Sequence, residues 1–146
     1  MNDQQIEQEI QAKGLTAPRV TPADIEANIA GEYYFTAADG VAGYHPAIHS
    51  LVEGASAKAL AEWDDRRWKV DASVPPSLRL LTFCVLVLRN GFTVTGESAC
   101  ASPENFDAEL GRKIARQNAV QKLWPLMGYA LKERLANNAN PQGAMQ

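Results

Sequence analysis

The clearest pattern in the chain is a nearly continuous apolar run over residues 80–88, rich in β-branched and aromatic side chains. An apolar run of this length without polar alternation predicts a β-strand that is covered on both faces. Asn90 and Gly91 follow the run, and this pair favours a two-residue type I′ turn, in which both residues adopt positive φ. The pattern therefore predicts a β-hairpin.

The turn fixes the register of the predicted hairpin. With a two-residue turn, Arg89 pairs with Phe92, and Cys84 faces Glu97. The second strand becomes small and polar over residues 96–99, where a ligand or another backbone could approach closely. We therefore expect one apolar strand and one more open strand.

A long C-terminal helix is predicted after the hairpin. Ser102 is its expected N-cap, with Pro103 at the first helical position. Apolar side chains at helical spacing then continue to residue 135. Pro125 removes one backbone hydrogen bond and disfavours helical geometry at the residue before it, so we expect a kink or break there.

Capping signals predict a second helix in the N-terminal half. Thr21 can cap this helix, and Asp24 lies in its first turn, near the positive end of the helix dipole. Gly31 can end the helix. The aromatic run over residues 33–36 then favours a strand, and residues 37–40 are typical of a turn.

The first residues and the middle of the chain give weaker patterns. Residues 1–20 are polar and form either a short helix or a frayed terminus. Residues 50–63 could form a helix, and Trp63 and Trp68 belong to a charged patch that ends at Lys69. The whole stretch 41–77 is interpreted as an inserted segment or a functional loop.

Together these elements predict an α+β fold. An antiparallel β-hairpin or small sheet packs on a long C-terminal helix that is kinked near Pro125, and a helical segment precedes it. The expected organisation is a polar N-terminal segment over residues 1–20, a single α+β domain over residues 21–136 and a flexible tail over residues 137–146.

Charge makes some partners improbable. The 146 residues carry a formal net charge of -3, which argues against general nucleic-acid binding. The sign is uneven, because residues 1–80 hold 12 acidic and 7 basic side chains, whereas residues 103–135 hold 4 acidic and 6 basic ones. The C-terminal helix could therefore face an anion.

No apolar run approaches the roughly 20 residues of a membrane span, and the first residues lack a signal-peptide pattern, so we expect a soluble cytoplasmic protein.

No catalytic or metal-binding motif emerges from the residue spacing. His45 and His49 are four residues apart, but Pro46 lies between them and no further ligand has a suitable spacing, so no metal site is expected. Ser98 lies in a sequence that lacks the second glycine of a nucleophile elbow, and no histidine follows it. The two cysteines are expected to be reduced. We therefore expect no enzyme activity and no cofactor.

A basic face near the start of the long helix is the strongest candidate for binding. Arg112, Lys113 and Arg116 follow Asn105, which is expected near the N-terminus of this helix. Helix N-termini bind anions, and arginine holds phosphate with a planar fork. Phe92 at the hairpin tip could stack on a base. The alternative is that Phe92 caps the core and that the basic side chains are only solvated.

Several motifs carry a resemblance to known proteins. The segments EYYFTAADG, SPENFD, GRKIAR and LWPLMGY, together with the hairpin over residues 81–100, resemble a family of small tailed-bacteriophage proteins without an assigned function. This resemblance covers residues 21–135. The shorter core, which runs from the hairpin turn to Tyr129, is also similar to the phage anti-Thoeris sponge proteins.

The similarity to the sponges implies a function and a set of site residues. Sponges capture cyclic ADP-ribose isomers made by bacterial TIR-domain immune enzymes, or other cyclic oligonucleotides, and they hold the ligand intact. They form dimers and higher oligomers, with ligand sites where subunits meet. By this resemblance Phe92 stacks on a base, Asn105 hydrogen-bonds the ligand, and Arg112 and Arg116 meet phosphates.

The expected function is thus a phage anti-defence protein that sequesters a cyclic nucleotide in the host cytoplasm as a homo-oligomer. The chain departs from the smaller sponges by its longer N-terminal half. An alternative function is a protein-interaction module that inhibits or recruits a host protein, because Trp63 and Trp68 with their neighbouring arginines are typical of binding hot spots.

Overall fold

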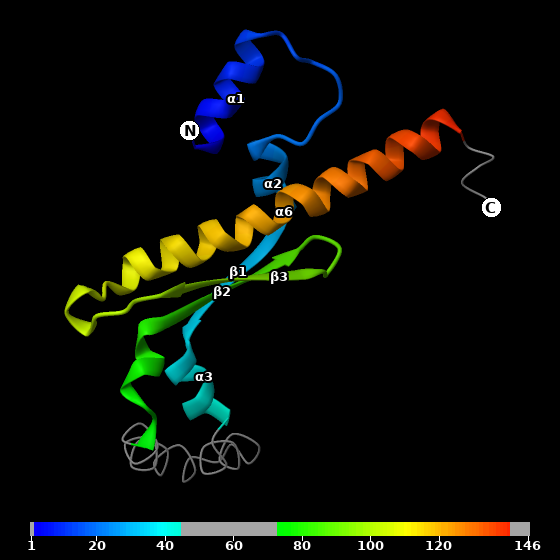
Figure 1. Cartoon of the computed structure of the whole chain (residues 1–146). Helices are drawn as coiled ribbons and strands as arrows, with labels where there is room; N and C mark the ends of the chain where they lie inside the picture. Colours follow the sequence, from blue (N-terminus) through cyan, green and yellow to red (C-terminus); the bar gives the residue numbers. More distant parts are fainter. Residues whose placement is uncertain (1, 45–72, 141–146) are drawn as a thin grey trace. The chain divides into compact units, whose positions relative to one another are not determined.

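The computed structural model describes residues 2–44 and 73–140 of the chain (Figure 1). Within these residues, the strands β1 (Ile29–Thr36), β2 (Leu81–Leu88) and β3 (Thr93–Ala99) form one antiparallel sheet in the order β1-β2-β3. The helices are α1 (Asp3–Ala12), α2 (Pro22–Asn28), α3 (Ala37–Tyr44), the long α6 (Ala108–Ala139), and the short 3₁₀ turns η1 (Pro76–Leu80) and η2 (Pro103–Asn105). This arrangement confirms the α+β fold with a small sheet, a long C-terminal helix and an N-terminal helix.

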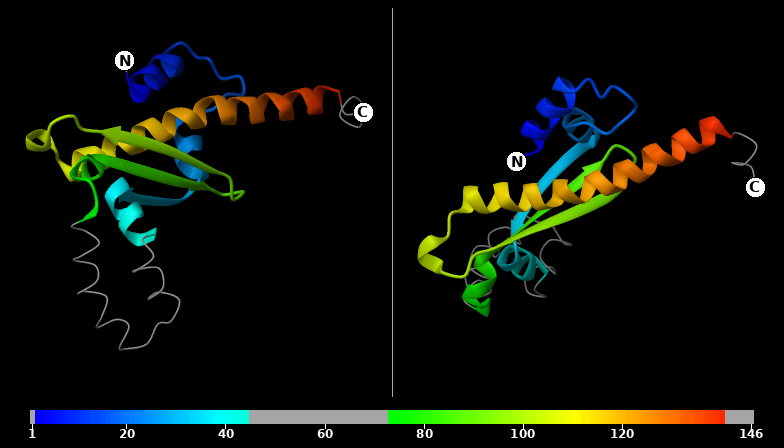
Figure 2. Two further views of the ribbon diagram at one scale, coloured as in Figure 1. Left: turned by 60° about the horizontal axis from the view of Figure 1, so that its bottom comes forward. Right: turned by 45° about the horizontal axis from the view of Figure 1, so that its top comes forward.

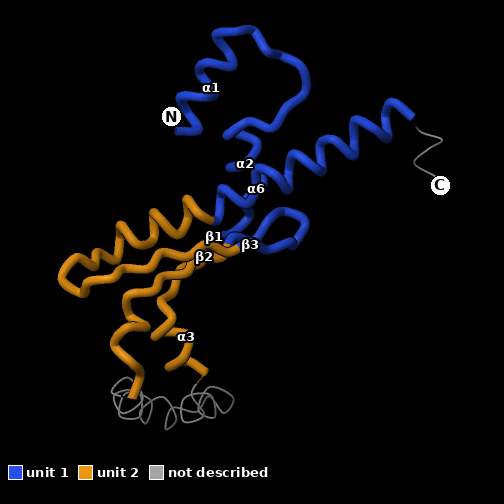
Figure 3. Tube along the Cα trace, viewed as in Figure 1, with its two compact units in different colours: residues 1–32, 86–94, 119–146 blue, residues 33–85, 95–118 orange. Residues whose placement is uncertain are grey.

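The chain divides into two compact units, which share the sheet strands and the long helix (Figure 3). Unit 1 comprises residues 1–32, 86–94 and 119–146, and unit 2 comprises residues 33–85 and 95–118. Each unit has its own buried residues. In unit 1 these include Ile25, Leu86 and Leu123, and in unit 2 they include Cys84 and Ala115.

Burial along β2 alternates strictly. Thr82, Cys84, Leu86 and Leu88 are buried, whereas the residues between them are half-buried. One face of this apolar run is therefore buried, whereas the other face is only partly covered in the described structure. In unit 2 the first turns of α6 lie along the hairpin strands, as the two views of Figure 2 show.

The hairpin turn differs from the predicted type. Leu88 N donates to the Phe92 carbonyl at 2.8 Å, and Gly91 N donates to the Leu88 carbonyl at 2.9 Å. Gly91 has φ 87°, and Asn90 is not among the residues with positive φ. The turn is thus a three-residue loop that ends in a left-handed glycine, not a type I′ turn. The Asn90 side chain explains the difference, because its Oδ1 accepts a hydrogen bond from Phe92 N at 2.9 Å.

The longer loop shifts the register by one residue. Leu88 lies opposite Phe92, and at the other end Cys100 N donates to the Leu80 carbonyl at 3.0 Å, which keeps the same register. Cys84 therefore lies opposite Gly96 and not Glu97. Gly96 is buried and Glu97 is exposed, in agreement with this register. A shift of one residue exchanges the two faces of the second strand.

The long helix begins later than predicted. Ser102 precedes only the 3₁₀ turn η2, and its side chain makes no capping hydrogen bond. Asp107 caps α6 instead, since its Oδ1 accepts from Leu110 N at 2.8 Å and its carbonyl accepts from Gly111 N at 2.9 Å. At the other end, α6 continues through Pro125 to Ala139 without a break. Leu123 just before the proline is fully buried, so packing holds the helix where one backbone bond is missing.

The N-terminal elements confirm some predictions and correct others. Thr21 and Asp24 form a capping box at the start of α2, as expected, but the helix ends at Asn28, and Gly31 lies in β1. The predicted turn over residues 37–40 is the start of helix α3. Its capping box was overlooked: Thr36 Oγ1 accepts from Asp39 N at 3.1 Å, and Asp39 Oδ2 accepts from Thr36 N at 3.0 Å.

Residues 3–12 form the helix α1, so the frayed terminus is the wrong alternative for them. The predicted helix over residues 50–63, the Trp63 and Trp68 patch, and His45 and His49 lie outside the described residues. Among residues 2–44 and 73–140, every helix is too short or too polar to span a bilayer.

Candidate functional site

A small hollow in unit 2 brings together residues from both halves of the chain. It has a volume of about 110 Å³. Its walls come from the end of β1, the start of α3, β2, and the chain that leads into α6. The lining residues are Tyr34, Phe35, Thr36, Asp39, Thr82, Phe106, Ala108 and Arg112.

Aromatic rings supply the apolar part of the hollow. Phe35 is held by Phe83 of the neighbouring strand, with ring centroids 5.4 Å apart and ring planes at 28°. Phe35 nevertheless stays 38% exposed. An aromatic ring that keeps part of its surface accessible can stack on a planar ligand.

Arg112 supplies the positive charge. It is exposed and makes no hydrogen bond or ion pair within the described part of the chain. Its neighbour Lys113 pairs with Glu109 one turn earlier, at 3.2 Å. Of these two basic side chains, Arg112 is therefore the one whose charge remains available, and its planar guanidinium can bind a phosphate or carboxylate through two parallel hydrogen bonds.

Asp39 supplies an acceptor at the same hollow. One of its carboxylate oxygens is used by the capping box of α3, where it accepts from Thr36 N. A carboxylate has further lone pairs and can accept a hydroxyl or amide hydrogen from a ligand. The hollow therefore combines a cation, an acceptor and aromatic rings. Within the described residues, no group of His, Cys, Asp and Glu could hold a metal ion.

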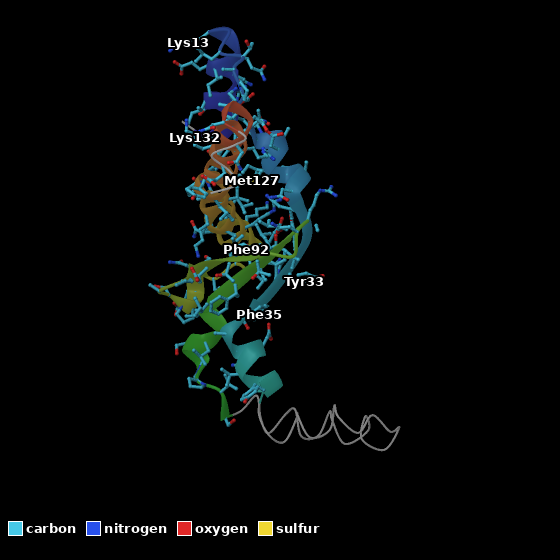
Figure 4. All side chains as sticks on the ribbon, turned by 90° about the vertical axis from the view of Figure 1, so that its right-hand side faces the viewer. Lys13, Tyr33, Phe35, Phe92, Met127 and Lys132 are labelled. Atoms are coloured by element: carbon cyan, nitrogen blue, oxygen red, sulfur yellow. The ribbon has the colours of Figure 1, made fainter. Side chains whose placement is uncertain are left out.

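The four predicted site residues lie in different places. Arg112 lines the hollow, and Arg116 follows it one turn later on α6 and is half-buried. Asn105 is the exposed last residue of η2, three residues before α6 begins, which corrects its expected place at the start of the helix. Phe92 belongs to unit 1, where it directly follows the hairpin turn and is 54% exposed (Figure 4). The roles of these four residues remain predictions.

Sequence reasoning missed most of the hollow. The sequence pattern places Phe35 in a strand and Asp39 in a turn, and it gives no ligand-binding role to Thr82 or Phe106. The Thr36-x-x-Asp39 spacing is a capping signal that could have been found. The pairing of Phe35 with Phe83 depends on how β1 and β2 align, and the sequence contains no local sign of it.

Comparison with known proteins identifies the family of this chain. Residues 20–135 match the family described as "Phage protein (N4 Gp49/phage Sf6 gene 66) family". No curated protein and no solved structure matches the chain. The match spans well over half of the sequence, so the chain belongs to this family of phage proteins, as its motifs predicted. The similarity to anti-Thoeris sponges stays a prediction.

Proposed function

We propose that this member of the phage protein family captures a cyclic nucleotide signal of host immunity and holds it without degrading it. The ligand class is a cyclic ADP-ribose isomer or a cyclic oligonucleotide, and the place of action is the host cytoplasm. The observation that carries the proposal is the guanidinium of Arg112, which has no partner among the described residues and lies in the same hollow as Phe35.

The chemistry of the hollow fits the parts of a nucleotide. A base can stack on an aromatic ring, which is worth about 1–3 kcal/mol in single-strand binding proteins. A phosphate can accept two charge-assisted hydrogen bonds from Arg112. A ribose hydroxyl can donate to the free lone pairs of Asp39. Capture alone needs these binding groups and no activated nucleophile or general acid.

The size of the hollow indicates that it holds only part of such a ligand. Sites for drug-sized molecules have volumes of roughly 300–1,000 Å³, whereas this hollow has about 110 Å³. The remaining parts of a cyclic nucleotide must contact other groups. Phe92, Asn105 and Arg116 are the predicted sources, and a second copy of the chain can supply them, which is why we expect a homo-oligomer.

Isothermal titration calorimetry with purified protein tests the proposal. Cyclic ADP-ribose isomers and cyclic dinucleotides are titrated into the wild type, Arg112→Gln and Lys113→Gln. We expect binding by the wild type, a loss of about 10- to 100-fold in Arg112→Gln because a charged hydrogen bond is removed, and near wild-type binding in Lys113→Gln. The ligand should be recovered unaltered after heat denaturation.

Three outcomes would contradict the proposal. Absence of heat with both ligand classes would remove cyclic nucleotide binding. Recovery of a cleaved ligand would show an enzyme instead of a sequestering protein. Equal losses in Arg112→Gln and Lys113→Gln would show that the positive charge of the helix matters and that the hollow does not.

A further inference from the structure

Helix α1 is held together by its own local interactions. At its N-terminus, Asn2 and Gln5 form a reciprocal capping box, in which both hydrogen bonds measure 2.9 Å. At its C-terminus, Gly14 adopts φ 66°, and Leu15 N donates to the Ile10 carbonyl at 3.3 Å. These caps satisfy backbone groups that would otherwise need partners elsewhere. The helix therefore does not need tertiary packing to complete its ends.

The contacts that dock α1 within unit 1 are mainly polar. No residue of α1 is buried. Asp3 Oδ2 accepts from Trp124 Nε1 at 3.1 Å and from Gln121 Nε2 at 3.4 Å. Glu7 accepts two hydrogen bonds from Arg19, at 2.6 and 2.7 Å. Helix α1 is thus attached by two carboxylates on one of its faces.

Two hollows border this attachment. One has a volume of about 220 Å³ and the other about 480 Å³, and Glu7, Arg19 and Pro22 line both. Ile6, on the docked face, is still 44% exposed. Apolar side chains beside a solvent-open hollow keep surface in contact with water that close packing would bury. The smaller hollow is lined by Asp3, Ile6, Glu7, Ile10, Arg19, Val20, Pro22, Gln121 and Trp124.

The family match includes residues on one side of the smaller hollow and leaves out α1 on the other side. It begins at residue 20, so Val20, Pro22, Gln121 and Trp124 belong to the family part of the chain, and α1 precedes it. We call these four residues the arm groove. Residues 13–18, which lead from α1 towards the groove, are all exposed. Helix α1 is therefore an appended, tethered segment that occupies a groove of the family domain.

We propose that α1 is an exchangeable arm, which docks in the arm groove of a second copy of this chain. In the exchanged state Asp3 and Glu7 of one copy meet Trp124, Gln121 and Arg19 of the other, so every polar contact is conserved. Within one chain the two hollows remain beside α1. In the exchanged state the tether no longer joins α1 to the groove that it occupies, so Ile6 and Ile10 are free to close on that groove.

Exchange of identical elements costs little because the same contacts form in both states. Protein concentration then decides between the two states, since the tether sets the effective concentration of the arm within one chain. Arm exchange does not depend on ligand capture, because all its residues belong to unit 1. Figure 4 labels Lys13, the C-cap residue that follows α1 and begins the tether.

Disulfide trapping in the full-length protein tests arm exchange. In a Cys100→Ser background, Ile6→Cys places a thiol on α1 and Val20→Cys places one outside it, and both positions line the same hollow. The two single variants, one of them labelled with nitrogen-15, are mixed and mildly oxidised. We expect a disulfide between one labelled and one unlabelled chain, with a yield several-fold above that of Gln8→Cys mixed with Val20→Cys. Gln8 is exposed and lines neither hollow.

Ile10→Cys is a second position on the arm and should give the same result as Ile6→Cys. The double variant Ile6→Cys/Val20→Cys, at low concentration, reports docking within one chain. Two results together would overturn the proposal. The double variant would form its disulfide within single chains, and the mixture would give no more product than the Gln8→Cys control at any concentration. Absence of both disulfides would show that α1 does not dock in the groove.

Discussion

Gly111 of α6 lies directly against Thr82 of β2, because a Cβ atom on this glycine would stand 3.1 Å from Thr82 Oγ1. Thr82 is only 4% exposed, so its side chain has little room to move. The contact holds the first turn of α6 close to the strand in unit 2. It thereby positions Arg112, the next residue, at the hollow.

Gly111→Ala should therefore destabilise the protein. Alanine improves helix propensity by about 1 kcal/mol relative to glycine, but overpacking a close contact costs about 1–3 kcal/mol. We expect a net loss of about 1 kcal/mol in the free energy of unfolding, measured by denaturant titration. Gly128→Ala is the matched control, since among the described residues no atom outside the neighbouring helix backbone lies within 4 Å of its added Cβ, and it should stabilise the protein. Equal stabilisation by both variants would show that the Thr82 side chain moves and makes room for the added methyl group.

The start of α6 gives a second prediction. Asp107→Ala removes the side chain that accepts from Leu110 N, and loss of an N-cap costs about 0.5–2 kcal/mol. Ser102→Ala should change the free energy of unfolding by less than about 0.5 kcal/mol, as expected for a surface substitution outside such features, because the Ser102 side chain makes no capping bond. Both values come from chemical denaturation. A larger loss in the free energy of unfolding for Ser102→Ala than for Asp107→Ala would support the predicted helix start at Ser102.

The predicted and the observed cap of α6 show how far the sequence could predict the fold. Ser102 and Asp107 are both residue types that favour the N-cap position, and Pro103 after Ser102 favoured the earlier start. The choice between them depends on the contact between Gly111 and Thr82, which joins residues far apart in the chain. The type and order of the main elements follow from local patterns, but such boundaries depend on tertiary packing.

The hairpin and the hollow show the same limit. Asn90 and Gly91 correctly predict a turn, but the Asn90 side chain bonds to Phe92 N and selects a loop one residue longer. The hollow combines Phe35, Asp39 and Arg112, which only the pairing of strands and the path of α6 bring together. Of this hollow, the sequence predicted only Arg112, because a basic helix face is visible in a local pattern.

The loop geometry gives a third prediction. Gly91 has φ 87°, and a side chain in the left-handed region costs roughly 1–2 kcal/mol. We therefore expect Gly91→Ala to lower the free energy of unfolding by that amount. Asn90→Ala should cost only about 0.5–1.5 kcal/mol, the value of one hydrogen bond, because Asn90 does not need positive φ. In a type I′ turn both positions would need positive φ, so equal large losses would contradict the three-residue loop.

Acid should release α1 through Glu7. Two hydrogen bonds from Arg19 stabilise the charged carboxylate, and a third comes from Gln11, so the pKa of Glu7 is lowered from 4.5 to about 2. A lowered pKa means that the interaction is fully present above pH 4.5 and is lost as the pH falls toward 2. The indole N–H of Trp124 donates to Asp3, which lies in α1 together with Glu7. We therefore expect the Trp124 indole N–H resonance to shift in this pH window.

Glu7→Gln is the control for acid release, because glutamine does not titrate and cannot form a charged pair with Arg19. In this variant the Trp124 resonance should already lie near its acid position at neutral pH. Its remaining change between pH 4.5 and 2 should be smaller than in the wild type. Trp124→Phe assigns the resonance, since two other tryptophans are present in the chain. A wild-type resonance that does not move above pH 2, or an identical titration in Glu7→Gln, would show that the Glu7–Arg19 pair does not hold the arm.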